Sequence, residues 1–320
     1  MDYITYPVLF VVLTLLELLY FRIADRFNII DKPNERSSHT SITLRGGGVI
    51  FVVPPLIYCI LNGGEYLWFA LGLLLISTIS FVDDVRSLSG KIRLAVHLLA
   101  VSLMFYDLGI FSTHLAVIVI AYILVIGTIN AYNFMDGING ITGTYSLVFL
   151  FAVLLANQYT PFIQDEFIIY SAIGALVFLM FNFRKKAKCF AGDVGSVAMA
   201  FVVLFLLIKL ILATEDYKYV LFLAVYGVDS VLTIVHRIIL RQNIFMAHRL
   251  HLYQYLTNTL KWPHLAVSSL YAALQAIVSA WVVFSTSVTF TSFALMLIGL
   301  GAVYVVVKSL IIRGKITPVA

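Results

Sequence analysis

The chain has little charge for its length. Of its 320 residues, 12% are charged and 62% are hydrophobic. A water-soluble globule of this length needs more polar surface than that to cover its core. The scarcity of charge therefore excludes a soluble fold and predicts a polytopic membrane protein.

Cysteine is also scarce. Cys59 and Cys189 lie on different segments without metal-type spacing, so they predict neither a disulfide framework nor a zinc site. The first apolar stretch lacks a preceding basic region and is followed by many others, which argues against a cleaved signal peptide. Since no long polar stretch intervenes, we expect a single transmembrane domain over residues 1–320.

The apolar stretches predict the fold. A helix needs about 20 mostly apolar residues to cross the hydrocarbon core, and the chain has about 11 such stretches. We therefore expect an all-α protein with 10 to 11 transmembrane helices, of which the second and fourth are the weakest. The stretches are residues 4–23, 48–62, 66–82, 94–106, 114–130, 141–156, 167–183, 194–213, 219–240, 264–284 and 290–312.

Basic residues predict the orientation. With the N-terminus outside, every Lys and Arg except Lys209 and Lys218 falls on one side of this arrangement, whereas the opposite loops are acidic. The positive-inside rule places the basic side in the cytoplasm. The basic residues behind the net charge of +5 are separated by apolar spans and form no surface module for nucleic acid. Contact with an anionic lipid or an anionic substrate explains them better.

Five polar clusters interrupt the apolar sequence, and all of them fall on the basic side. They hold most of the charge of the chain. Because they share one face, they predict an active site rather than a passive anchor. The clusters are residues 31–48, 81–93, 130–140, 184–196 and 246–254.

Four aspartates lie at the inner ends of spans, and two of the clusters add amides or glycines. Carboxylates at a membrane boundary are costly unless they meet water, a cation or a basic partner. They are either solvated helix ends or, as their repetition favours, one shared site whose hard oxygen ligands suit Mg²⁺ or Mn²⁺. No serine with a partnered histidine is evident. The residues are Asp83, Asp84, Asp136 and Asp193, with Asn130 and Asn133 before Asp136.

Glycines accompany these acids. Glycine lets the backbone approach a ligand closely, and a glycine turn that opens a helix exposes N–H groups to phosphate. Together with the acids they predict a site for a metal-bound diphosphate. The glycines are Gly46, Gly47, Gly48, Gly137, Gly140, Gly192 and Gly195.

Three motifs occur in order on successive inner loops. They are the pair Asp83-Asp84, the run NxxNxxDGxxG from Asn130 to Gly140, and GDxGS from Gly192 to Ser196. In this order the chain resembles the polyprenyl-phosphate N-acetylhexosamine-1-phosphate transferases, over nearly its whole length. That family includes phospho-N-acetylmuramoyl-pentapeptide transferase and enzymes that start O-antigen synthesis.

The resemblance implies a reaction and a location. A sugar 1-phosphate would pass from a UDP-sugar to undecaprenyl phosphate with release of UMP, as the first step of an O-antigen, capsule or exopolysaccharide. The enzyme would lie in the bacterial cytoplasmic (inner) membrane and use Mg²⁺. Elementary chemistry agrees: the acceptor phosphate is already an oxyanion, so the protein has mainly to neutralise two phosphates.

The resemblance also implies roles for the acids. Asp193 would bind Mg²⁺ together with Asn133. Asp83 would act as a base or orient the acceptor phosphate, and Asp84 would be a metal-side or structural carboxylate. Asn130 and Asp136 would line the nucleotide and metal region, and Phe190 matches an aromatic residue that stacks on uracil.

The last inner loop departs from the family pattern. Many relatives carry HxHH or HHH, where this chain has HLYQ over residues 251–254, so only His251 matches. We expect His251 to be catalytic and His248 and Arg249 to contact the diphosphate or sugar. The missing run argues against the muramoyl-pentapeptide substrate and leaves N-acetylglucosamine, N-acetylfucosamine and N-acetylquinovosamine open.

Basic residues of the earlier loops complete the expected site. Arg36 and His39 would help to close the nucleotide side, and Arg86 or Lys91 would supply the charge of a lysine found in some relatives. Isolated histidines on or beside the spans are expected to be packed or interfacial. They are His97, His114, His236 and His264.

Two other classes of protein fit the sequence less well. A transporter or lipid flippase predicts charges near the bilayer midplane and inverted repeats, and neither is visible in the sequence. A CDP-alcohol phosphotransferase would group its acids within one short motif. The sequence leaves the oligomeric state open, including a homodimer.

Overall fold

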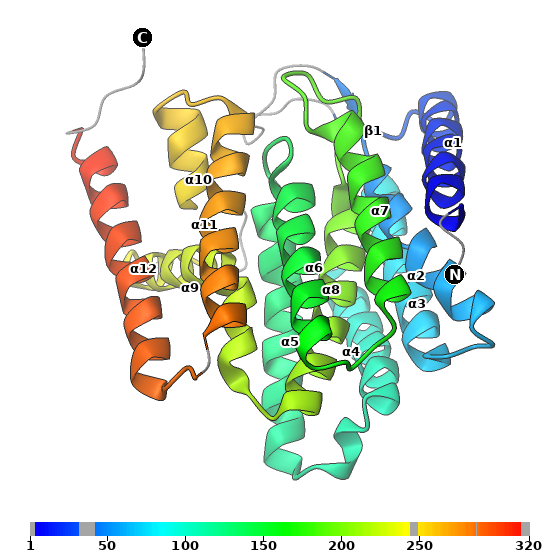
Figure 1. Ribbon diagram of the computed structural model, residues 1–320. Helices are drawn as coiled ribbons and strands as arrows, with labels where there is room; N and C mark the ends of the chain where they lie inside the picture. The colour runs from blue at the N-terminus through cyan, green and yellow to red at the C-terminus, as the bar shows by residue number, and fades with distance from the viewer. Residues whose placement is uncertain (1–3, 32–41, 244–248, 286, 315–320) are drawn as a thin grey trace.

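The protein is built almost entirely from helices, which confirms the expected all-α fold (Figure 1). The computed structural model describes residues 4–31, 42–243, 249–285 and 287–314. The α-helices are α1 (Thr5–Arg26), α2 (Val53–Leu61), α3 (Leu67–Val85), α4 (Gly90–Asp107), α5 (Leu115–Met135), α6 (Ile141–Tyr159), α7 (Asp165–Asn182), α8 (Gly192–Thr214), α9 (Ala224–Ile239), α10 (Leu252–Gln254), α11 (His264–Phe284) and α12 (Phe290–Ile312).

Short elements connect these helices. Two strands form a small antiparallel pair, and three 3₁₀-helices and one π-helical turn extend or join the longer helices. They are β1 (Ile30–Asp31), β2 (Thr43–Leu44), η1 (Gly47–Phe51), η2 (Ile110–Ser112), η3 (Tyr217–Leu223) and the π-helical turn η4 (Tyr255–Thr259).

Within the described ranges, 9 helical segments are long and apolar enough to cross a membrane, against the 10 to 11 expected. The expected span 48–62 is instead η1 and α2, which together make a shorter apolar helix, Gly47–Leu61. The expected span 94–106 lies in α4, which is helical but begins with Lys91 and Arg93 in its first turn. These two stretches were expected to be the weakest. The first falls short of a membrane span because its helix is short, and the second because of its polar residues.

Helix α8 lies at the centre of the bundle. Its most apolar window is 67% buried, whereas the corresponding windows of α5 and α12 are only 17% buried. It packs against α3 and α5, while α1 and α12 stand at opposite edges (Figure 1). A motif at the start of α8 is therefore surrounded by the ends of several other helices.

Backbone contacts tie three polar segments together at one end of the bundle. β1 pairs with β2, and Leu44 of β2 forms a parallel bridge to Cys189. The N–H groups of Gly47 and Gly48 donate to the carbonyls of Phe190 and Ala191, at 2.9 and 3.1 Å. The chain that enters α2 is thereby held against the chain that enters α8.

The same contact requires glycine on both sides. A Cβ added to Gly48 would lie 2.3 Å from Cα of Gly195, and one added to Gly195 would lie 2.5 Å from Cα of Gly48. The N–H groups of Gly47 and Gly48 are already hydrogen-bonded to the carbonyls of Phe190 and Ala191. The expected glycine turn therefore does not offer these N–H groups to a phosphate. The glycines serve close packing of backbone on backbone instead.

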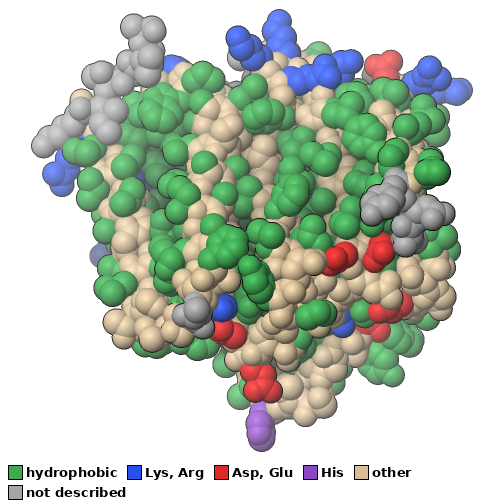
Figure 2. Space-filling view, in the orientation of Figure 1, with side chains coloured by type: hydrophobic (Ala, Val, Ile, Leu, Met, Phe, Trp, Pro, Cys, Tyr) green, Lys and Arg blue, Asp and Glu red, His purple; other side chains and the backbone are tan. Residues whose placement is uncertain are grey.

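Charge is distributed unevenly along the bundle. Figure 2 shows most of the visible Lys and Arg side chains along one end, and Asp and Glu mainly toward the other. The connection between α7 and α8 contributes the exposed residues Arg184, Lys185, Lys186 and Lys188 to the basic end. Between the ends the surface is largely hydrophobic, as expected for helices in contact with lipid.

The contact between Gly48 and Gly195 predicts a large effect of a single methyl group. Gly48→Ala should lower the free energy of unfolding by about 2 kcal/mol or more, because the added carbon meets backbone that cannot move aside. Thermal unfolding of the protein in detergent measures this change. Gly227→Ala in α9 is the matched control, since its Cβ meets nothing within 4 Å; equal unfolding temperatures in both variants would contradict the packing.

Candidate active site

Asp84 anchors the start of α8. Its carboxylate accepts hydrogen bonds from the backbone N–H groups of Asp193 and Val194, both at 2.9 Å. Its side chain is fully buried and pairs with Nε of Arg45 at 2.7 Å. The carboxylate thus satisfies N–H groups at a helix N-terminus, where negative charge is favoured. These contacts favour the structural one of the two roles expected for Asp84, and the metal-side role stays untested.

Gly192 permits this arrangement. It has φ of +71°, a conformation that side chains disfavour. A Cβ at this position would lie 2.6 Å from Oδ2 of Asp84. Glycine immediately before Asp193 is therefore needed for the carboxylate of Asp84 to reach the backbone of α8.

Asp83 and Asp193 face the same arginine. Nη1 of Arg93 lies 2.8 Å from Oδ2 of Asp83 and 3.8 Å from Oδ2 of Asp193. Nη2 of Arg45 lies 3.5 Å from Oδ1 of Asp193. With Asp84, three carboxylates surround two guanidinium groups, so the cluster keeps an excess of negative charge.

The amides and the acid of α5 lie along one side of this cluster. Oδ1 of Asn133 accepts a hydrogen bond from Oγ of Ser196 at 2.8 Å, which links α5 to α8. Asn130 donates to the carbonyl of Ile126 at 2.8 Å. Asp136, just beyond α5, accepts from Thr142 at 2.6 Å, and removal of its carboxylate from water raises its pKa to about 7.

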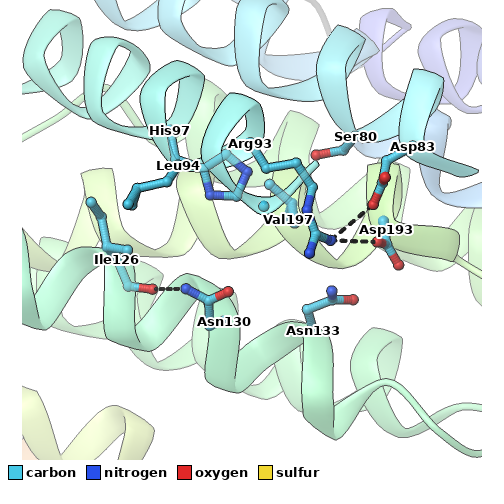
Figure 3. Close-up of a pocket in the computed structure, with 11 residues that line it drawn as sticks. Ser80, Asp83, Arg93, Leu94, His97, Ile126, Asn130, Asn133, Asp193 and Val197 are labelled. Carbon is cyan, nitrogen blue, oxygen red and sulfur yellow. Dashed lines mark hydrogen bonds and ion pairs between the residues drawn. The ribbon is translucent and has the colours of Figure 1, made fainter. Parts of the chain in front are cut away.

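A small pocket of about 90 Å³ opens beside these residues (Figure 3). Side chains from α3, α4, α5 and α8 converge on it, so the structure brings together residues far apart in the sequence. Four of the expected site residues line it: Asp83, Asn130, Asn133 and Asp193. Its remaining lining residues are Ser80, Gly90, Arg93, Leu94, His97, Ile126 and Val197.

The oxygen atoms at this pocket fit a hard cation. Among the described residues no group of three or more His, Cys, Asp or Glu side chains is arranged to hold a metal. Asp83, Asp193 and Asn133 nevertheless present carboxylate and amide oxygens at one cavity with excess negative charge. Mg²⁺ binds through one or two carboxylates and leaves its other positions to water and phosphate, so this donor set suits it.

His251 lies in a different cluster. Its Nδ1 is 3.1 Å from Oδ1 of Asp229, whose other oxygen accepts from the hydroxyl of Tyr271 at 2.6 Å. Both His251 and Asp229 are buried, and the N–H of Leu252 also donates to Asp229 at 3.1 Å. The structure therefore joins His251 to α9 and α11 rather than to the carboxylates of α3 and α8.

The other expected residues are placed less centrally. Phe190 is half-buried, and its N–H donates to the carbonyl of Leu44 at 2.8 Å. Lys91 is exposed and Arg249 is half-buried. None of these three lines the pocket. Arg36, His39 and His248 lie outside the described residues.

Three basic residues of the site were not expected from the sequence. Arg45 and Arg93 pair with the aspartates, whereas Arg86 and Lys91 were expected to supply that charge. His97 was expected to be packed or interfacial; it is buried, and it also lines the pocket. The position of Arg45 directly before three glycines, and the spacing of four residues between Arg93 and His97, were the available signals.

Comparison with known proteins gives one family and several relatives. The sequence model of the family described as glycosyl transferase family 4 matches residues 66–211, which include all three motifs. A probable undecaprenyl-phosphate N-acetylglucosaminyl 1-phosphate transferase of Bacillus subtilis (strain 168) is 26% identical over 72% of this chain and 70% of its own. The phospho-N-acetylmuramoyl-pentapeptide-transferase of Streptococcus mutans is 30% identical over 59% of this chain and 66% of its own.

A third relative extends the comparison. The undecaprenyl-phosphate alpha-N-acetylglucosaminyl 1-phosphate transferase of Escherichia coli (strain K12) is 28% identical over 59% of this chain and 57% of its own. The chain thus aligns with 57% to 70% of the length of these relatives.

The two adjacent aspartates should differ when each is replaced. Asp84→Asn should lower the free energy of unfolding by about 3 kcal/mol, because Arg45 loses its buried partner and the amide N–H₂ meets the N–H groups of α8. Asp83→Asn should lower it by less than about 1 kcal/mol, since its partner Arg93 is 42% exposed. Thermal unfolding in detergent compares the two variants. Equal losses of unfolding free energy would contradict the different roles given to Asp83 and Asp84.

Proposed function

We propose that the chain is a member of glycosyl transferase family 4 and that it transfers an N-acetylhexosamine 1-phosphate from a UDP-sugar to undecaprenyl phosphate or another polyprenyl phosphate. The observation that carries this proposal is the pocket at which Asp83 and Asp193 meet Arg93 and Arg45. It lies where the polar end of the bundle joins the apolar spans. A water-soluble nucleotide and a membrane-bound phosphate can therefore reach it from different sides.

The reaction balances without a covalent enzyme intermediate. An oxygen of the acceptor phosphate attacks the β-phosphorus of the UDP-sugar and forms a new P–O bond. The bond from that phosphorus to the bridging oxygen of the diphosphate breaks, and UMP leaves with the electron pair. Since the nucleophile is already an anion, the main barrier is the repulsion between two phosphates, which positioned positive charge lowers.

The residues of the pocket divide this work. Arg93 reaches toward both Asp83 and Asp193 and offers positive charge to the reacting phosphates. Asp83 orients the acceptor phosphate or takes its last proton. Asp84 keeps Asp193 in place through the backbone of α8, because it accepts the N–H groups of Asp193 and Val194. Asp84 is thus a positioning residue.

Mg²⁺ is the proposed cofactor, with Mn²⁺ as its substitute. Asp193 and Asn133 would hold the ion through oxygen atoms at the pocket. When bound, it supplies positive charge to the diphosphate and to the departing UMP. The three carboxylates and two guanidinium groups of the cluster support this proposal, because the excess negative charge favours a cation.

The nucleotide binds on the side of the α7–α8 connection. Phe190, half-buried beside β2, is the proposed platform for uracil, and Asn130 and Asp136 line the route to it. Basic residues at this end, including Lys91 and Arg249, attract the diphosphate. His251 is bonded to Asp229 and is not among the pocket-lining residues, which supports a role in holding the last loop to Asp229 rather than in the transfer itself.

The basic end of the bundle faces the cytoplasm. The gathering of Lys and Arg at this end (Figure 2) supports this orientation through the positive-inside rule. The protein would then act in a bacterial inner membrane, where the product would begin a cell-envelope polysaccharide such as O-antigen, capsule or exopolysaccharide.

A transfer assay tests the proposed function. Membranes that contain the protein should move label from a radiolabelled UDP-N-acetylhexosamine into the lipid phase when undecaprenyl phosphate is added. EDTA should abolish transfer, and Mg²⁺ or Mn²⁺ should restore it. Asp193→Asn should reduce transfer by about 100-fold or more, the scale on which loss of one electrostatic contact to a transition state acts.

The control for Asp193→Asn is Asp25→Asn, which changes an exposed acid of α1 by the same chemistry. It should transfer label at the rate of the unaltered protein. Activity of Asp193→Asn near that rate in saturating Mg²⁺ would contradict the role of Asp193. Absence of transfer from every UDP-N-acetylhexosamine would contradict the proposed function.

The pH profile should report the ionisation of Asp136. Its pKa of about 7 predicts that the transfer rate falls as the pH drops below neutrality. Protonation removes the negative charge that the carboxylate of Asp136 is proposed to contribute to the nucleotide and metal region. Thr142→Val removes a hydrogen bond to the ionised form and should move this acidic limb upward by about one pH unit. Thr142→Ser retains the hydroxyl and should not move the limb. Superimposable pH profiles for Thr142→Val and the unaltered protein would show that the ionisation of Asp136 does not limit the transfer rate.

A further inference from the structure

The last inner loop is attached to α9 by its own side chains. Figure 1 shows α10 at the same end of the bundle as the connection between α7 and α8. Just before α10, His251 pairs with Asp229 of α9, and the N–H of Leu252 donates to the same carboxylate. The imidazole of His251 stacks on the ring of Tyr253, with ring centroids 5.7 Å apart and an angle of 22° between the planes. The loop therefore forms a fixed support beside the helices that end here.

Tyr253 extends this support to α5. A helix leaves its last four backbone carbonyls without partners inside the helix. In α5 the carbonyl of Asn133 accepts the N–H of Asp136 at 3.3 Å, whereas the carbonyl of Phe134 accepts the hydroxyl of Tyr253 at 2.9 Å. Only 1% of Tyr253 is exposed, so its hydroxyl is shielded from water. A side chain from the last loop thereby closes the end of α5.

Gly137 leaves room for the hydroxyl of Tyr253. A Cβ at Gly137 would overlap with that oxygen and would lie 2.9 Å from Cζ of the same ring. Gly137 is not among the residues with positive φ, so the backbone conformation does not require glycine at this position. Space requires it, because the tyrosine hydroxyl lies where a side chain would begin. This contact explains one glycine of the NxxNxxDGxxG run.

The end of α5 carries two residues of the proposed function. Asn133, a proposed metal ligand, lies one position before Phe134, and Asp136 lies two positions after it. The hydrogen bond from Tyr253 therefore holds the backbone at a carbonyl between them. On the far side of that carbonyl, the carboxylate of Asp136 accepts from Thr142 at 2.6 Å. Loss of the Tyr253 hydroxyl would leave this turn fixed by fewer contacts.

The polar side chains of the loop point into the protein. His251, Tyr253 and Gln254 are all buried. Oε1 of Gln254 accepts the N–H of His251 at 3.2 Å, which forms part of a capping box at the start of α10. None of the three residues lines the pocket. The loop therefore contributes to the site through the segments that it holds, rather than through contacts with a substrate.

We propose that Tyr253 is a positioning residue for the transfer reaction. Its hydroxyl fixes the carbonyl of Phe134 at the end of α5, and this contact sets where Asn133 and Asp136 lie beside the pocket. The inference rests on the proposed function and deepens it, because it gives the last loop a role on the nucleotide and metal side of the site. Asp229 and His251 hold the loop in place for this contact.

Removal of the Tyr253 hydroxyl tests the proposal. Tyr253→Phe should lower kcat/KM for the UDP-sugar by about tenfold, the factor that corresponds to one hydrogen bond. KM for undecaprenyl phosphate should stay within about twofold, since no acceptor contact is assigned to this turn. Calorimetric titration of UMP in Mg²⁺ should show a loss on the donor side without any reaction. Hydrogen exchange of the amides of residues 136–140 should become faster, because their turn has lost a support.

Tyr58→Phe is the matched control. Tyr58 is also fully buried, and its hydroxyl donates to Glu65 at 2.8 Å in the connection between α2 and α3, on the outer side of the expected topology. The two variants lose the same atom and the same kind of hydrogen bond, so their unfolding temperatures should fall by similar amounts. Tyr58→Phe should leave kcat/KM for the UDP-sugar and the exchange of residues 136–140 unchanged. Equal losses of kcat/KM in both variants would show general loosening and overturn the proposal.

A double-mutant cycle tests the contact between Tyr253 and Gly137. Gly137→Ala should lower kcat/KM for the UDP-sugar by about 100-fold, because the added carbon displaces the hydroxyl and with it the turn. In Tyr253→Phe the oxygen is absent, and the same substitution should cost only about tenfold. Equal factors in the two backgrounds would show that the two residues act independently, which would overturn the proposed contact.

The remaining outcomes also decide the inference. Faster exchange of residues 136–140 in Tyr253→Phe with unchanged kcat/KM would show a purely structural contact and overturn the positioning role. A rise in KM for undecaprenyl phosphate alone would place the effect on the acceptor and overturn it too. If Gly137→Ala does not fold, Tyr253→Phe and Tyr58→Phe decide the point. No transfer by the unaltered protein would contradict the proposed function itself, and this outcome is distinct from all of these.

Discussion

The buried carboxylate of Asp84 holds the candidate active site together. It joins three parts of the chain. Asp84 belongs to α3, its carboxylate accepts hydrogen bonds from N–H groups at the start of α8, and it forms an ion pair with Arg45 of the segment before η1. A carboxylate without water must have all its charge compensated. Here two backbone donors and one guanidinium provide that compensation. The position of Asp193, and hence the shape of the pocket, depends on this arrangement.

Charge balance sets the second constraint. Asp83 and Asp193 can lie at one cavity because Arg93 and Arg45 reduce the repulsion between them. The compensation is incomplete, which leaves the pocket attractive to a cation while its arginines remain attractive to phosphate. A site for a diphosphate needs both properties, since it must bind a negatively charged group and neutralise it in the transition state.

Close packing converts these contacts into fixed geometry. Gly48 and Gly195 bring two backbones into direct contact, so the segment that carries Arg45 cannot shift relative to α8. On the other side of the bundle, Asp229 holds the last loop through His251 and the N–H of Leu252. Two separate buried acids thus organise the two halves of the polar end, one beside the pocket and one away from it.

The sequence by itself determined the fold class, most of the helical segments and the set of acids at one end of the bundle. These follow from local properties, namely the length of apolar runs and the place of a polar residue within a run. The identity of the partners did not follow. Arg45 meets Asp84, Arg93 meets Asp83 and His251 meets Asp229 because of how each helix is rotated about its axis and which neighbours it packs against. Only the tertiary structure decided this, since residues 109 positions apart, such as Asp84 and Asp193, come into contact through the packing of α3 on α8.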